Sequence, residues 1–186
     1  MKDKSEVGAK TGDQGDTSLG NGVRVAKSSA RIIALGEVEE ANAVIGLARL
    51  EADAQTEAVL ARIQTDLSDL WEDLSMPISE DGLGVMRIVP NQILGLEAWL
   101  EAVWETLAPQ RDSILPAGSP LAVRLYVARA VVRRAERAVV QLLEAPEEAV
   151  NRLILIYLNR LSDLLFALAR AANGMGGADI VRGAGG

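Results

Sequence analysis

Residues 11–22, with the sequence TGDQGDTSLGNG, combine glycine, hydroxyl and acidic side chains. Glycine lets backbone N–H groups approach a ligand closely, hydroxyls can donate to phosphate, and carboxylates can hold a divalent cation. The segment contains almost nothing that could build a hydrophobic core. Two interpretations follow, a binding loop or a frayed polar terminus, and composition alone does not decide between them.

Three arginines, Arg129, Arg133 and Arg137, stand four residues apart beside an apolar stripe. On a helix they form one line, where like charges repel by roughly a few tenths of a kcal/mol per pair. We therefore expect an anionic partner that offsets this repulsion. Carboxylates of another helix are one candidate. A polyphosphate is the other, because guanidinium groups match phosphate oxygens and keep their charge.

Two polar pairs interrupt otherwise apolar segments. Glu39 and Asn42 are three residues apart, and Asn159 and Asp163 are four residues apart. Either pair alone is typical of a structural hydrogen-bond network. Their occurrence together with the loop and the arginine row makes them candidate site residues.

The composition excludes several kinds of chemistry. The chain has no Cys and no His, so disulfides, thiolate metal sites and the commonest general base are ruled out. Its formal net charge of −7 argues against binding to nucleic acid or to an acidic membrane surface. No apolar run reaches the roughly 20 residues of a membrane span, and the N-terminal residues lack the apolar segment that is typical of a signal peptide. We therefore expect a soluble, cytoplasmic protein.

Beyond the loop, apolar residues recur at spacings of three and four, which predicts helices that pack at shallow angles. Aromatic residues make up only 3% of the chain, so the core should be aliphatic. The predicted helices are 29–51, 54–76, 91–107, 121–142 and 154–172, with Asn91 as the N-cap of the third. The fold class is therefore all-α, a five-helix up-and-down bundle, and no strand is predicted.

Six segments resemble one known family, the PduO-type ATP:cob(I)alamin adenosyltransferases (corrinoid adenosyltransferases). They follow the family's order along nearly the whole chain. The segments are AKTGDQGDTSL at 9–19, RVAK at 24–27, GEVEEANAVIGLA at 36–48, ILPAGSPLA at 114–122, VARAVVRRAERAVV at 127–140 and YLNRLSDLLFALAR at 157–170.

The resemblance implies a homotrimer that binds ATP between subunits. It divides the chain into a nucleotide-binding loop segment at 1–28, the five-helix bundle at 29–173 and a flexible glycine-rich tail at 174–186, all within one domain. It also implies an ion pair between Glu39 and Arg129 across the subunit boundary, both with catalytic roles. The nucleotide-binding residues that it implies are Lys10, Thr11, Gly12, Asp13, Gly15, Thr17, Ser18, Lys27, Arg133, Arg134, Glu136, Arg137 and Asn159.

The implied reaction is attack of the reduced cobalt of cobalamin on the 5′ carbon of ATP, with release of triphosphate. Mg²⁺, Lys27 and the arginines would stabilise the leaving group, and we assign no protein residue to the cation. The implied partners are a cob(II)alamin reductase and a cobalamin-dependent acceptor enzyme. Two alternatives are an ATP-binding module that has lost corrinoid alkylation and a purely structural bundle.

The chain departs from the family's pattern at five positions. Ser113 replaces an aromatic residue at the corrinoid's lower face, and Tyr126 replaces a histidine. Ala117 replaces the first glycine of a PGG turn, Glu39 an aspartate and Gln14 a lysine. The nucleotide half of the implied site is therefore close to the family's pattern, whereas the corrinoid half differs from it.

Overall fold

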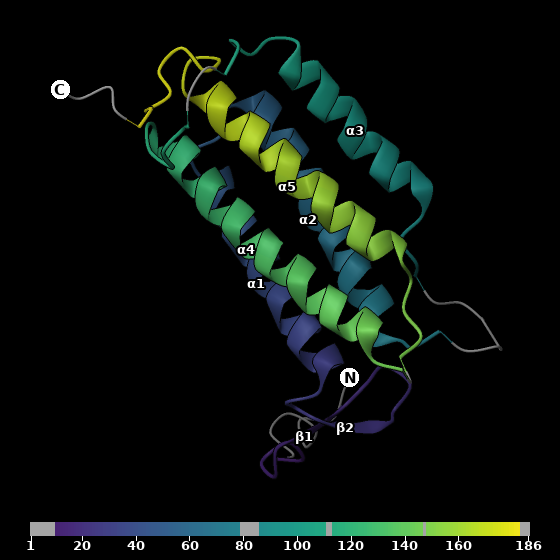
Figure 1. The fold of residues 1–186 in the computed structure, drawn as a ribbon. Coiled ribbons are helices and arrows are strands. Elements are labelled where there is room, and N and C mark those ends of the chain that lie inside the picture. Colours follow the sequence, from purple (N-terminus) through teal and green to yellow (C-terminus); the bar gives the residue numbers. More distant parts are fainter. Residues whose placement is uncertain (1–9, 79–85, 111–112, 147, 183–186) are drawn as a thin grey trace, which may run out of the picture.

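Five helices form the body of the structure (Figure 1). Their apolar residues at three- and four-residue spacing are buried in the interior of the bundle. The computed structural model describes residues 10–78, 86–110, 113–146 and 148–182. The helices are α1 (Ala30–Arg49), α2 (Ala54–Ser75), α3 (Pro90–Trp104), α4 (Pro120–Glu144) and α5 (Leu153–Ala172). The predicted all-α bundle is confirmed. Within the described residues, no helix is both long and apolar enough to cross a membrane.

The predicted stripes form an aliphatic core. On α1 the stripe residues have no exposed surface, and on α4 the stripe is buried except for Leu121, which is half-buried. Each fully buried leucine or isoleucine contributes about 1.5–3 kcal/mol to stability through the hydrophobic effect. The buried stripe residues of these two helices are Ala34, Val38, Ala41, Ile45, Ala48, Leu125, Ala128, Val132, Ala135, Val139 and Leu142.

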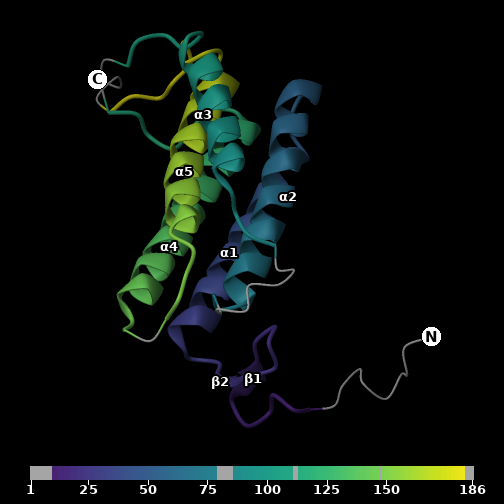
Figure 2. The same ribbon diagram turned by 90° about the vertical axis from the view of Figure 1, so that its right-hand side faces the viewer.

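The helices are neighbours in the order α2, α1, α4, α5 and α3. Figure 2 shows α1 and α2 as one pair, with α4, α5 and α3 beside them. Two seams of this arrangement concern the site, one between α1 and α2 and the other between α4 and α5. Because α1 packs against α4, these two helices separate the two seams.

The start of α3 differs from the predicted N-cap at Asn91. The N-cap is Val89, whose N–H donates to the side-chain oxygen of Gln92 at 3.0 Å. Pro90 takes the first helical position, where its fixed φ suits the helix and its missing N–H costs nothing. Proline therefore decides this boundary in place of the asparagine.

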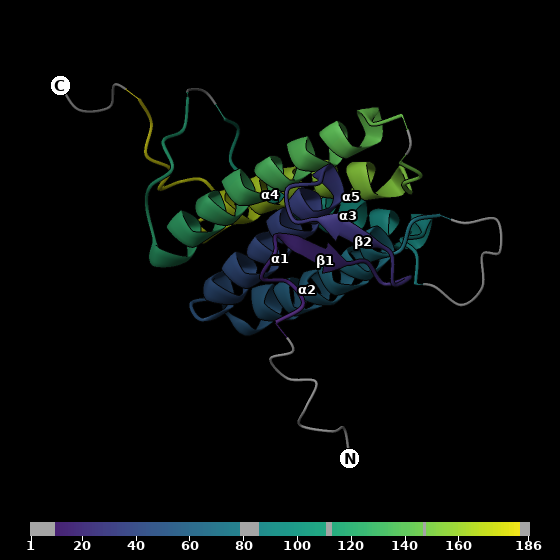
Figure 3. The ribbon, with the colours of Figure 1, turned by 90° about the horizontal axis from the view of Figure 1, so that it is seen from below.

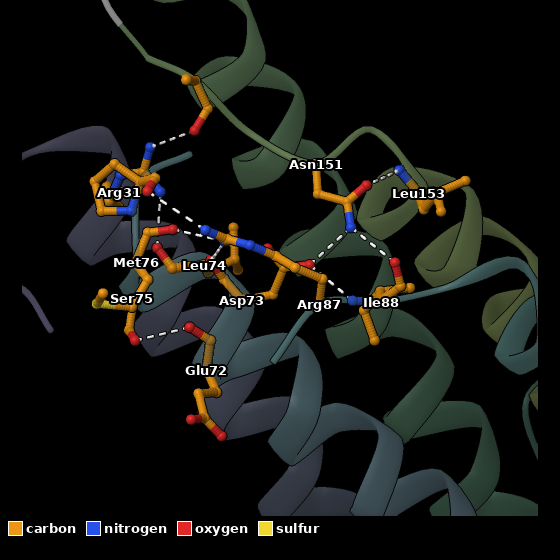
Figure 4. Close-up of polar contacts among 12 residues, drawn as sticks. Arg31, Glu72, Asp73, Leu74, Ser75, Met76, Arg87, Ile88, Asn151 and Leu153 are labelled. Atoms are coloured by element: carbon orange, nitrogen blue, oxygen red, sulfur yellow. Dashed lines mark hydrogen bonds and ion pairs between the residues drawn. The ribbon is translucent and has the colours of Figure 1, made fainter. Parts of the chain in front are cut away.

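A buried polar network ties the loops together at the end of the bundle where α1 begins (Figure 4). The Arg31 side chain, 1% exposed, pairs with Glu148 at 2.5 Å and donates to the Leu74 carbonyl at 2.8 Å. Asp73 accepts hydrogen bonds from the Arg87 side chain and from the Ile88 N–H, at 2.7 and 2.8 Å. The network fixes the end of α2, against which the N-terminal segment packs.

That segment contains a hairpin that the sequence did not predict. Strands β1 (Asp16–Ser18) and β2 (Arg24–Ala26) pair antiparallel below the start of α1 in Figure 1, and Figure 3 shows this hairpin across that end of the bundle. The Gly20 N–H donates to the Ser75 carbonyl at 3.1 Å. A Cβ at Gly20 would lie 2.5 Å from the Met76 sulfur, so any larger residue here would have to displace the Met76 side chain.

The glycine-rich C-terminal segment also differs from the predicted flexible tail. Its residues 174–182 fold back on the bundle, where Ile114 and Val181 form a β-bridge. The Arg170 and Asp179 side chains form an ion pair at 2.8 Å, and both are almost completely buried. Residues 183–186 of the predicted tail and 1–9 of the predicted loop segment lie outside the described residues.

Candidate active site

A pocket of about 520 Å³ lies between the hairpin, α1 and the end of α2. Its lining includes the predicted site residues Thr17, Ser18, Lys27 and Glu39, together with the exposed indole of Trp71. The volume is within the range of small-molecule sites, about 300–1,000 Å³. With hydroxyl and ammonium groups beside apolar walls, the pocket can hold a phosphate group next to an uncharged ring system.

The loop that leads into the hairpin is held by its own hydrogen bonds. The Asp13 N–H donates to the Lys10 carbonyl at 3.1 Å, and the Gly15 N–H donates to the Gly12 carbonyl at 3.2 Å. The Lys27 N–H donates to the Gly15 carbonyl at 2.8 Å. A Cβ at Gly12 would lie 3.1 Å from the Lys27 Nζ atom. The predicted loop residues are thus brought together around the charge of Lys27.

Arg24 is a loop-anchoring residue that sequence reasoning missed. Its guanidinium donates to the Thr11 carbonyl at 2.7 Å and to the Ser18 hydroxyl at 3.4 Å. Arg24 stands opposite Ser18 in the hairpin register. The only signal in the sequence was the position of Arg24 in the RVAK segment, and its role depends on a strand pair that was not predicted.

The polar pair on α1 borders a second, smaller pocket of about 150 Å³, which Glu39 and Asn42 line together with Trp71. The Asn42 amide donates to the Gln64 carbonyl at 3.3 Å, but the Asn42 Oδ1 atom is buried without a hydrogen-bond partner in the described structure. Asp163 on α5 is exposed and belongs to neither pocket.

The exposed face of α4 carries two predicted arginines with no carboxylate partner. In the part of the chain that the structure describes, no acidic side chain lies within ion-pair distance of Arg133 or Arg137. Beside them, the Asn159 amide donates to Glu136 at 3.0 Å, and Arg160 donates to the Asn159 Oδ1 at 3.1 Å. Arg133 and Arg137 are permanently charged and lie next to the hydrogen-bonded Asn159–Glu136 pair, and together they form a surface that can bind phosphate.

Arg134 does not join this surface, because its side chain is turned toward α1, which the sequence did not predict. It pairs with Glu37 at 2.5 Å and also with Glu40, both on α1. The hydrogen bond to Glu37, followed by that to Glu40, raises the pKa of Arg134 above its ordinary value. Of the adjacent arginines predicted to bind nucleotide, Arg133 therefore faces outward and Arg134 serves the contact between α1 and α4.

A third pocket, about 410 Å³ in volume, lies along the seam between α4 and α5. Arg129, Tyr126 and Phe166 line it, with Ile114 and Pro116 at its edge. The Arg129 guanidinium stands 5.1 Å from the centroid of the Phe166 ring. Among the described residues, the Arg129 Nε and the Tyr126 hydroxyl are buried without hydrogen-bond partners. An apolar pocket with two unsatisfied donors has the character of a ligand site.

Two of the departures from the family's pattern lie next to this pocket. The exposed Ser113 is not among its lining residues, although its neighbour Ile114 is. Ala117 accepts a hydrogen bond from the Asn173 amide at 3.0 Å, and Gly118 has a φ of 117° against the same side chain. Sequence reasoning missed Phe166, which together with Tyr126 gives this pocket its aromatic surface.

The predicted catalytic pair is not brought together within one subunit. Glu39 lies at the seam between α1 and α2, and Arg129 lies at the seam between α4 and α5. The loop pocket and the arginine face likewise occupy different sides of the bundle. One chain thus presents the predicted site residues in two separate places.

Known proteins resemble this chain both in amino-acid sequence and in fold. The chain is 46% identical over 172 residues to the corrinoid adenosyltransferase of Mycobacterium tuberculosis, covering 91% of this chain and 89% of that protein. It is 45% identical over 175 residues to the cobalamin adenosyltransferase of Cupriavidus metallidurans, covering 93% and 91%.

Among solved structures, a single-residue variant of the PduO-type ATP:corrinoid adenosyltransferase from Lactobacillus reuteri, complexed with cobalamin and ATP, superposes with a TM-score of 0.87. The sequence identity is 33%, and the match covers 96% of this chain and 99% of that one. The family model described as cobalamin adenosyltransferase matches residues 7–172. The chain therefore belongs to the cobalamin adenosyltransferase family.

Proposed function

We propose that the protein transfers the 5′-deoxyadenosyl group of ATP to the cobalt of reduced cobalamin and releases triphosphate. The observation that carries this function is the pair of half-sites, a glycine-rich loop pocket on one side of the bundle and unpaired arginines beside an apolar pocket on the other. The relatives named corrinoid adenosyltransferase and the neighbour complexed with cobalamin and ATP support it. A shared polyphosphate explains why both half-sites carry cations.

The complete site forms between copies of the chain in a homotrimer. Arg133 and Arg137 are exposed and lack carboxylate partners in the described structure, so a phosphate chain held by a neighbouring loop would satisfy both. Glu39 of one copy would then face Arg129 of the next, whose Nε lacks a partner. A trimer closes such a head-to-tail contact into a ring, so no half-site is left over.

Mg²⁺ accompanies the triphosphate in this proposal. Magnesium in nucleotide sites is usually held by one or two carboxylates together with phosphate oxygens and water. Asp13 and Asp16 are exposed carboxylates of the loop and would be the protein groups available to hold the cation. The cation would reduce the charge that Lys27 and the arginines must neutralise.

The reaction places few demands on acid–base chemistry. The electron pair of the reduced cobalt forms the bond to C5′ while the C5′–O bond breaks. The electrons of the C5′–O bond leave with the triphosphate. No proton has to be removed, which agrees with a chain that has no histidine. Lys27, Arg133 and Arg137 stabilise the departing charge, and the loop aligns the ribose carbon with the metal.

The pocket between α4 and α5 is the proposed corrinoid side of the site. Its volume of about 410 Å³ suits part of one corrinoid face rather than the entire ligand. Phe166 and Tyr126 give it an apolar surface that excludes water from that face. A cob(II)alamin reductase that supplies the reduced metal and an acceptor of the product remain the expected protein partners, in the cytoplasm.

The test is to mix the protein with ATP, Mg²⁺ and chemically reduced cobalamin and to follow the loss of cob(I)alamin absorbance. We expect one adenosylcobalamin and one triphosphate for each ATP consumed. A protein that binds MgATP but does not alkylate the cobalt would instead be the ATP-binding module. A protein that binds neither ligand would be the structural bundle.

A further inference from the structure

A buried ion pair fixes the C-terminal segment to the bundle. The side chains of Arg170, near the end of α5, and Asp179 are 2% and 6% exposed, and their charged atoms are 2.8 Å apart. Arg170 also donates to the Ala108 carbonyl at 2.7 Å and stands 5.6 Å from the centroid of the Trp104 ring. The Asn173 amide contacts the second oxygen of Asp179 at 3.4 Å. Both charges are thus satisfied by several groups, as burial requires.

The next residues after Asp179 bond to the edge of the proposed corrinoid pocket. The Leu115 N–H donates to the Ile180 carbonyl at 2.7 Å, and the Arg182 N–H donates to the Ser113 carbonyl at 3.0 Å. Ile114, between these two bonds, forms the β-bridge with Val181. Residues 180–182 therefore join the ion pair to the loop at 113–115.

Ile114 stands between two cavities. On one side is the pocket of about 410 Å³ with Arg129 and Phe166, and on the other a cavity of about 210 Å³ that Arg170, Asp179 and Ile114 line. With free volume on both sides, core packing constrains Ile114 only in part, so the backbone hydrogen bonds of its neighbours Ser113 and Leu115 to the C-terminal segment must complete its positioning. The charges of the pair also reach the pocket. Burial raises the pKa of Tyr126, and the nearby Asp179 raises it further.

We propose that Asp179 is a positioning residue for the corrinoid side of the site. By holding Arg170, it keeps residues 180–182 against 113–115 and so sets the pocket wall that Ile114 forms. The inference rests on the proposed function for the identity of the ligand, but the positioning itself can be measured without turnover. The nucleotide pocket contains none of these residues, so the effect should be confined to the corrinoid.

The test compares the parent chain with Asp179→Asn, and with Glu51→Gln as the matched control. Glu51 is also an acid in an ion pair, with Arg124, but both side chains are partly exposed and neither lines the two cavities beside Ile114. In Asp179→Asn we expect faster hydrogen exchange at the Leu115 and Arg182 amides. We also expect the affinity for cob(II)alamin to fall, and the corrinoid KM to rise, by about tenfold or more. The ATP KM should stay within about twofold, and the control should resemble the parent.

A second variant addresses the same link without touching the buried pair. Arg182→Pro removes the N–H that bonds to Ser113, together with the exposed Arg182 side chain, and leaves the buried pair intact, so it should fold even if Asp179→Asn does not. It should also weaken corrinoid binding selectively. Unchanged corrinoid affinity in Arg182→Pro, or an equal loss for ATP and corrinoid in either variant, would overturn the positioning role. If the parent fails to alkylate cobalamin, the proposed function fails, while hydrogen exchange and cob(II)alamin binding still decide the positioning claim.

Discussion

Glu39 and Arg129 lie on different seams of the same bundle. Glu39 lines the loop pocket together with Trp71, between α1 and α2. Arg129 stands over the Phe166 ring, between α4 and α5. Because α1 packs directly against α4, the body of these two helices separates the two side chains. A contact between a carboxylate and a guanidinium at these positions therefore requires a second copy of the chain.

A mixing experiment tests the shared site directly. Glu39→Gln and Arg129→Ala should each be nearly inactive alone, because every site of either homotrimer lacks one partner. When the two variants are unfolded, mixed in equal amounts and refolded together, about a quarter of the sites should regain both residues. Activity recovered in the mixture is the measurement, and sedimentation should report a trimer for the parent. A clean monomer with ATP bound would contradict the model.

Lys27 and Arg133 should bind phosphate from opposite half-sites. Each alanine variant should lose about 1–3 kcal/mol of MgATP binding free energy, which is the range for charge-assisted hydrogen bonds. Calorimetric titration with MgATP measures the loss. The matched control is Arg124→Ala, on the same helix as Arg133 but paired with the exposed Glu51. If Arg124→Ala weakens MgATP binding as much as Arg133→Ala does, the loss comes from the change in net charge and not from a contact between Arg133 and phosphate.

Phe166 should carry the role that the family gives to an aromatic at the position of Ser113. Phe166→Ala removes the ring beneath Arg129 and opens the pocket to water. We expect a strong loss of activity when enzyme-bound cob(II)alamin must be reduced, and a weaker loss with cobalt already reduced chemically. Ser113→Phe should improve the first assay more than the second. If Phe166→Ala affects both assays equally, Phe166 acts by packing alone.

The helices could be predicted because each is long enough to repeat its apolar spacing several times, and the stripe through Ala34 and Ile45 is fully buried as expected. The hairpin could not, because strands of three residues are too short to show an alternating pattern. The C-terminal segment was also unpredictable. Its stability comes from the pairing of Arg170 with Asp179, and a glycine-rich composition gives no sign of that contact.

Within the candidate site, the sequence showed which residue types are present but did not show which way their side chains point. Arg133 and Arg134 are adjacent in sequence, but a helix turns by about 100° per residue, so neighbours point to different surroundings. The contacts of each side chain depend on where α1 packs against α4, and Arg134 forms an ion pair with Glu37 of α1. Phe166 escaped notice for the same reason, since an apolar residue on α5 looks like core until the seam with α4 is known.

Arg31 should be essential for the end of the bundle that supports the loop pocket. Arg31→Met keeps the apolar length but leaves Glu148 and the Leu74 carbonyl without their donor. Removing one partner of a largely buried pair costs about 3 kcal/mol. Urea unfolding of the ligand-free protein measures this, with Arg49→Met as control because the Arg49–Glu57 pair is partly exposed. Equal destabilisation by the two changes would contradict the assigned importance of the buried network.

Tyr157 should make the protein less stable in alkali. Its hydroxyl donates to Asp66 at 3.2 Å, and burial, followed by the charge of Asp66, raises its pKa well above the ordinary value of 10. The folded chain therefore keeps the phenolic proton at a pH where the unfolded chain loses it. The free energy of unfolding should be unaffected by this group below about pH 10, and above it should fall by up to about 1.4 kcal/mol per pH unit.

Tyr157→Phe isolates that contribution, because phenylalanine has no proton to lose and all other titrating groups are shared with the parent. Urea unfolding of both proteins from about pH 8 to pH 11 should give curves that run parallel below pH 10 and converge above it as the parent loses stability faster. Tyr126, whose pKa burial also raises, is present in both chains and cancels in the difference. Curves that stay parallel throughout would mean that Tyr157 ionises in the folded protein as readily as in the unfolded chain, which its burial opposes.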